Sequence, residues 1–246
     1  MSPMLTIAKR EYRSYFESPL AYVVICLSFA AMGVMFFMYE GGFWQRNLAT
    51  LSTMFQYVPY GLCLLVVPVV TMRLLAEEKR SGTLEMLITL PVKDSDVILG
   101  KYLGALGLVL TLVLATLVYP ITMFRGLPWT LGPLDMGPVL SGYLGLILLS
   151  GATVAIGLLV SALTDSQAVA FFVTFIVFLM LWFVVGTVGG TVSGWFGNTL
   201  LYISFQERLD GFVRGLIDTR DVVYFLTVTV LALIVAFRAL ERRKWA

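Results

Sequence analysis

The chain has 246 residues, of which 59% are hydrophobic and only 13% charged, and its mean hydropathy is +0.90. About a quarter of the residues in a soluble domain are charged, so this chain has too little polar surface to coat a globule. Composition therefore identifies an integral membrane protein. The net charge of +2 does not indicate a nucleic-acid partner, and the absence of histidine excludes Ser-His-Asp, Cys-His and HExxH chemistry.

Nothing in the sequence indicates a catalytic, metal or cofactor site. The two cysteines, Cys26 and Cys63, lie inside apolar runs, and there is no CxxC pair. No phosphate-binding GxxxxGK[ST] or GxGxxG loop is present either. We therefore expect no enzyme activity, no metal and no cofactor in this chain, so that any energy source belongs to another chain or to an ion gradient.

Six stretches are long and apolar enough to cross a membrane, which takes about 20 residues. They are residues 20–39, 57–75, 99–123, 139–163, 168–192 and 222–240. The fourth and fifth stretches are separated only by a tight turn at 164–167. Because no acidic or basic residue is evident at mid-span, an ion-coupled carrier is disfavoured. We predict an all-α integral membrane fold with six transmembrane helices in a single domain, residues 1–246.

The basic residues predict the orientation. With six spans both termini lie on one side, and that side carries 12 of the 17 Lys and Arg residues. The positive-inside rule places this side in the cytoplasm. Residues 5–17 are predicted to form an N-terminal interfacial helix there, with apolar and aromatic side chains on one face and basic ones elsewhere. The alternative is a simple basic flank of the first span.

The cytoplasmic loop at residues 77–91 is predicted to hold a short helix with helix breaks at both ends. A charged cluster from Glu77 to Arg80 precedes a break at Ser81-Gly82, after which Thr83 can cap a new helix that Pro91 terminates. Leu84, Leu87 and Ile88 form an apolar stripe on this helix, and Glu85 lies in its first turn. Such a helix suits docking into a partner's groove; the alternative is a solvated loop that packs on its own membrane face.

An outer segment, residues 193–221, is predicted to form an amphipathic re-entrant helix after glycines break the fifth span. Phe205, Leu209, Phe212 and Leu216 fall on one face at helical spacing, and polar residues including Arg214 fall on the other. The segment is expected to be a lid over an exit path, a dock for an outer partner or a structural cap.

The loop resembles the signature region of ABC-2 type permeases. EEKRSGTLEMLITLP at 77–91 and DVILGKY at 96–102 reproduce in order the family's charged cluster, Gly-Thr-Leu-Glu core, Leu-Pro end and Gly-Lys. The six-span layout and the outer segment agree, so that the resemblance covers essentially the whole chain. Stretches at 131–135, 142–145, 157–164 and 208–221 are similar to the gliding-motility-associated branch.

This resemblance implies a multi-pass subunit of the bacterial inner membrane. Two such chains, identical or homologous, would pair, and each would dock a cytoplasmic ATPase subunit that holds ATP and Mg. The ATPase-coupling residues would be Glu77, Glu78, Lys79, Arg80, Gly82, Thr83, Leu84 and Glu85. In the motility-like branch an auxiliary membrane protein with a large outer domain often accompanies the permease.

The function expected from the resemblance is coupling of a partner's ATP hydrolysis to export or conformational change. Two alternatives remain open. The complex could transmit force to an outer-face partner without moving a substrate, or the chain could be a stand-alone secondary carrier. The sequence does not name a substrate.

Overall fold

The computed structural model describes residues 2–38, 51–82, 93–124 and 135–242, and these residues form helices and turns with no strand. The α-helices are α1 (Pro3–Glu17), α2 (Pro19–Met38), α4 (Ser52–Gly61), α5 (Val67–Thr71), α6 (Ala76–Arg80), α8 (Asp94–Ala115), α9 (Val118–Phe124), α10 (Met136–Leu163), α11 (Gln167–Leu179), α12 (Val185–Thr191), α13 (Trp195–Ile203), α14 (Phe205–Val213) and α15 (Thr219–Arg242). Wider π-helical stretches join α4 to α5 at Leu62–Val66 and α11 to α12 at Met180–Val184.

The helices agree with the predicted membrane spans. Five are long and apolar enough to cross a membrane, and α1 with α2 supplies a sixth span if this pair, bent by 76°, is counted as one. The five are Met54–Arg80, Asp94–Ile121, Met136–Leu163, Gln167–Thr191 and Thr219–Arg242. An α-helix satisfies its own backbone hydrogen bonds, which is why such apolar segments fold this way in lipid. The fold class predicted from the sequence is confirmed.

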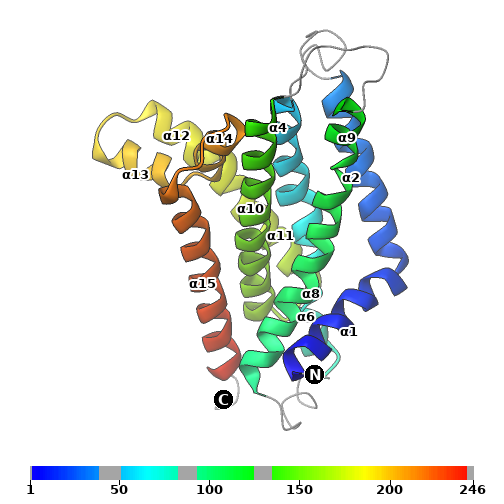
Figure 1. The fold of residues 1–246 in the computed structure, drawn as a ribbon. Coiled ribbons are helices and arrows are strands. Elements are labelled where there is room, and N and C mark those ends of the chain that lie inside the picture. Colours follow the sequence, from blue (N-terminus) through cyan, green and yellow to red (C-terminus); the bar gives the residue numbers. More distant parts are fainter. Residues whose placement is uncertain (1, 39–50, 83–92, 125–134, 243–246) are drawn as a thin grey trace.

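Both ends of the described chain lie at the same end of the bundle (Figure 1). We call this the proximal end, and the opposite end the distal end. The proximal end holds α1, α6 and the start of α8, whereas α14 and the hairpin of α12 and α13 lie at the distal end. The charged residues of the loop region and those of the outer segment are therefore at opposite ends of the molecule.

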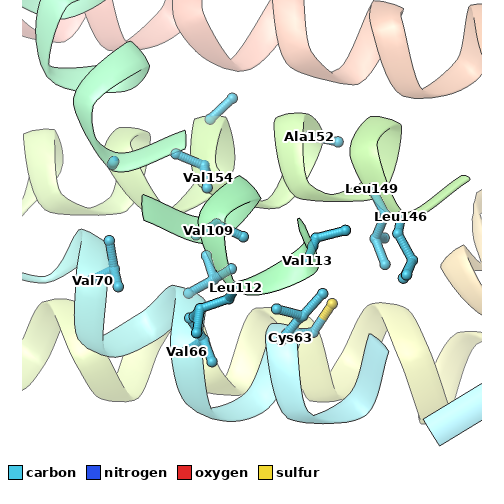
Figure 2. Packing of buried hydrophobic residues seen from close by; sticks show 14 of the residues in the cluster. Cys63, Val66, Val70, Val109, Leu112, Val113, Leu146, Leu149, Ala152 and Val154 are labelled. Atoms are coloured by element: carbon cyan, nitrogen blue, oxygen red, sulfur yellow. The ribbon is translucent and has the colours of Figure 1, made fainter. Parts of the chain in front are cut away.

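Helix α10 forms the centre of the bundle. It contacts α15, α8, α11, α5 and α14, and 72% of its most apolar stretch is buried. Figure 2 shows the core, in which Cys63, Val66 and Val70 meet the side chains of α8 and α10. By contrast, only 22% of Gln167–Thr191 and 17% of Thr219–Arg242 are buried by this chain. These two spans therefore present broad apolar faces to lipid or to another protein.

Candidate functional site

The span Met54–Arg80 is not regular helix throughout its proximal part. Residues Met72–Leu75 form a turn rather than regular helix, and α6 follows it. The Ser161 hydroxyl of α10 accepts hydrogen bonds from the backbone N–H groups of Leu75 and Ala76, at 3.0 and 3.1 Å. Since the first N–H groups of a helix lack intrahelical partners, Ser161 holds the start of α6 against α10.

The side chain of Lys101 connects α1, α6 and α8. It is only 2% exposed, and its Nζ donates to Glu11 Oε1 at 2.8 Å and to Glu78 Oε1 at 2.7 Å. Arg10 adds a second cation, 3.6 Å from Glu11 and 3.9 Å from Glu78. A buried ammonium is stable only when it is paired and hydrogen-bonded. These ion pairs hold α1, α6 and α8 together. We call Arg10, Glu11, Glu78 and Lys101 the Lys101 cluster.

Glycines on α8 allow α1 to approach this closely. A Cβ at Gly104 would lie 2.6 Å from Glu11 Cβ and 3.0 Å from the Ala8 carbonyl oxygen, and a Cβ at Gly100 would lie 2.8 Å from Ile7. Only glycine leaves room for the backbone of α1 here. The Gly100–Gly104 pair packs helices within the chain, as small-residue pairs do in membrane proteins.

Lys79 ties α6 to the turn between α10 and α11. Its side chain is 2% exposed, and its Nζ donates to the carbonyl oxygens of Ala162 and Thr164, the latter at 3.2 Å, and lies 3.7 Å from Asp165. A cation is favoured there because the last carbonyls of α10 carry partial negative charge. Glu77 instead pairs with Arg73 at 2.9 Å.

Two of the predicted coupling residues have no such fixed role in the bundle. Arg80 is exposed, and Gly82 has a φ of 70°, a left-handed conformation that ends α6 as the predicted break requires. The remaining predicted coupling residues, Thr83, Leu84 and Glu85, lie outside the described residues.

A polar pocket of about 190 Å³ lies beside the Lys101 cluster, lined by residues of α1, α6 and α8 that include Glu11, Glu77 and Lys101. On its wall, the hydroxyl of Tyr15 in α1, outside the five spans, donates to the Val70 carbonyl at 2.9 Å. Burial, reinforced by the Glu11 carboxylate, raises the pKa of Tyr15, so this hydroxyl keeps its proton. Within the described residues, no group of three His, Cys, Asp or Glu side chains could hold a metal ion.

At the distal end, the predicted amphipathic helix forms as α14. Phe205, Leu209 and Phe212 are buried, and Phe212 and Leu209 pack where Gly145 of α10 leaves space. The Ser141 hydroxyl donates to the Phe212 carbonyl at 2.7 Å. Arg214 is on the exposed side and forms an ion pair with Asp210. The spacing correctly placed these three apolar residues on one helix face, and the structure buries that face against the bundle.

The prediction for Leu216 is wrong. Helix α14 ends at Val213, and Leu216 is 65% exposed beyond it. Gly215 has a φ of 90°, its N–H donates to Phe212, and the N–H of Leu216 donates to Gly211 at 2.9 Å. These two bonds around a left-handed glycine form a Schellman motif, which terminates a helix. Gly215 was the residue from which the end of this helix could have been predicted.

The remainder of the outer segment forms a helical hairpin. Helices α12 and α13 reverse direction at Ser193-Gly194, where Gly194 has a φ of 104°. A Cβ at Gly189 would lie 2.9 Å from the backbone N of Leu201, so α12 and α13 are in close contact at this glycine. The Arg208 guanidinium is 3.7 Å from the Tyr202 ring centre and 2.7 Å from Asp221, and it links α13, α14 and α15.

The comparison with protein families agrees with this architecture. The family model described as ABC-2 family transporter protein matches residues 45–239. The chain belongs to the ABC-2 transporter family. An ABC-2 chain is the permease component of an ABC transporter and is not its catalytic subunit. Membership in the family implies a partner ATP-binding subunit and typically a second permease chain. No curated protein matches the chain.

The family match distinguishes two parts of the Lys101 cluster. Glu78 and Lys101 fall inside the matched residues, whereas Arg10 and Glu11 of α1 precede them. From the sequence, Lys101 is a cytoplasmic basic residue and the lysine of the Gly-Lys pair in the family's signature, but nothing in it singles out Glu11 or Ser161 as a partner. Their roles depend on partners 90 and 85 residues away in the chain, which no local pattern indicates.

Proposed function

We propose that the chain couples ATP hydrolysis by a cytoplasmic ATPase subunit to export or conformational change across a bacterial inner membrane. In this proposal the proximal end faces the cytoplasm, ATP and Mg bind only to the partner, and two permease chains pair. The observation that carries the proposal is the attachment of α6. This helix directly precedes the signature loop, and Lys101, Lys79 and Ser161 join it to α1, α8 and α10.

Such attachment suits transmission of motion. A displacement applied to the loop after Gly82 would reach α6, because α6 is only five residues long and continues into that loop. From α6 it would pass to three other helices through ion pairs and hydrogen bonds rather than be lost in a flexible connection. Packed interfaces of this kind switch between discrete arrangements. The residues predicted for coupling, from Glu77 to Glu85, would form the contact with the ATPase.

At the distal end, α14 is the proposed exit element. Phe205, Leu209 and Phe212 anchor it, and Arg214 with Leu216 faces outward for a partner or a lipid headgroup. The similarity to the gliding-motility-associated branch supports an auxiliary membrane protein with a large outer domain as that partner. This branch assignment rests on the sequence stretches alone.

A mechanical coupler without cargo is the second candidate. The cavity between α2, α5 and α8 has a volume of only about 10 Å³, which holds no more than one water molecule. A cargo would therefore have to pass outside this part of the bundle, for example between two chains. Tightly packed helices without a water-filled cavity transmit displacement from one end of the bundle to the other. If no cargo is identified, this packing favours the mechanical coupler.

The experiment is co-purification with the ATPase from native membranes in mild detergent. We expect a soluble protein with a phosphate-binding loop in stoichiometric amount. Leu84→Asp should weaken its binding about 30-fold, as loss of an interface hot spot does. Arg80→Gln should weaken it about three- to fivefold. The matched control is Arg238→Gln, because Arg238 is equally exposed near the proximal end but lies in α15. Full ATPase stimulation by both variants would refute the assignment.

A further inference from the structure

A second cavity opens at the distal end of the bundle. It has a volume of about 460 Å³ and is lined by α4, α14, the start of α10 and the π-helical stretch Met180–Val184. This volume is within the range of small-molecule sites, about 300–1,000 Å³. The cavity is much larger than the one between α2, α5 and α8, so it has room for a small-molecule ligand.

One wall is aromatic. The ring centres of Tyr60 and Trp182 are 5.2 Å apart, and Tyr60 stacks on Phe183 at 5.3 Å. Trp182 is only 2% exposed, whereas Tyr60 is partly exposed, so Tyr60 presents more of this aromatic wall to the cavity.

The part of the lining that α14 supplies is acidic. Asp210 and Glu207 of α14 both line the cavity, but Asp210 is paired with Arg214. Glu207 forms no ion pair with any residue that the structure describes, which leaves the lining with one net negative charge. Aromatic faces and a carboxylate both attract organic cations.

We propose that this cavity binds an organic ammonium cation, with its ammonium group beside Glu207 and Tyr60. The same chemistry occurs in a free soluble ammonium compound and in the ethanolamine or choline headgroup of a lipid. Binding itself is independent of ATP coupling. Only the interpretation of the bound molecule as cargo rests on the proposed function.

The test uses the full chain in nanodiscs of phosphatidylglycerol, which carries no amine, with radiolabelled choline as the probe. We expect saturable binding. The neutral isostere 3,3-dimethyl-1-butanol should compete about tenfold less well, because it lacks the cation. Glu207→Gln should weaken choline binding about three- to fivefold. The control Asp218→Asn, which removes a nearby exposed carboxylate outside the cavity, should bind choline as the unmodified chain does.

For the lipid source, nanodiscs that also contain phosphatidylcholine or phosphatidylethanolamine should block choline binding in the unmodified chain. If these lipids do not compete, a soluble ammonium compound is the source.

The proposal is overturned if choline does not bind saturably and neither lipid is enriched around the chain over phosphatidylglycerol. It is also overturned if Glu207→Gln binds choline as tightly as the unmodified chain. These readouts need no ATPase. A chain that stimulates its ATPase but neither binds choline nor enriches either lipid would therefore contradict this inference alone. A chain that binds choline but gives no ATPase stimulation would contradict the coupling proposal alone.

Discussion

A few charged residues at the proximal end stabilise the contacts between helices. Lys101 has two carboxylate partners from different helices, and its side chain is almost completely enclosed. The carboxylates of Glu11 and Glu78 are 14% and 17% exposed, so they retain some contact with water. Removing the ammonium would leave two partly buried carboxylates close together. Their repulsion would be relieved only in part by Arg10.

We expect Lys101→Met to lower the free energy of unfolding by about 2–3 kcal/mol, somewhat less than for a fully buried pair because the carboxylates reach water. Thermal unfolding of the detergent-solubilised chain would measure this. Adding Glu11→Gln and Glu78→Gln to Lys101→Met removes the repulsion and should restore most of the lost stability. If the triple variant is no more stable than Lys101→Met alone, the ion pairs do not account for the effect.

At the scale of elements, glycines decide which helices can touch. Gly104 lies directly against the backbone of α1, whereas Gly190 in α12 has nothing within 4 Å of the position its Cβ would take. Both glycines are helical, so an alanine gains similar helix propensity at either position. The difference between the two substitutions therefore measures the packing of α1 on α8.

Gly104→Ala is expected to destabilise the chain by about 1–3 kcal/mol, the usual cost of overpacking a tight contact. Gly190→Ala should be neutral or stabilising by about 0.5–1 kcal/mol. Limited proteolysis of α1 would report the same difference, because a displaced α1 is cleaved faster. Equal behaviour of the two variants would show that α1 does not pack on Gly104 in the membrane.

The elements also show what a sequence can and cannot predict. Continuous apolar runs predicted the spans correctly, since length and hydropathy are local properties. The buried face of α14 followed from the spacing of Phe205, Leu209 and Phe212. The turn at Met72–Leu75 was not predicted, because it contains neither Gly nor Pro and depends on Ser161, a residue 86 positions from Leu75. Hydrogen bonds between residues far apart in the chain produce no periodic pattern in the sequence.

For the whole molecule, the two ends of the bundle have distinct chemistry. The proximal end concentrates 12 of the 17 basic residues by the sequence assignment of sides. Two of them, Lys79 and Lys101, are held inside the structure by carbonyl and carboxylate oxygens. Without these two, the sequence assignment still counts ten basic residues on this side, twice the five on the other side. The orientation itself stays a prediction.

This asymmetry predicts the orientation of the chain. In a background with Cys26→Ala and Cys63→Ala, we place single cysteines at exposed positions of the two ends, Arg220→Cys distally and Arg13→Cys proximally. A membrane-impermeant maleimide should label Arg220→Cys in intact cells, and Arg13→Cys only after the membrane is opened. Lys and Arg flanks resist translocation, which is the physical reason for this expectation. The opposite labelling pattern would place α6 outside the cell, where no cytoplasmic ATPase could reach it.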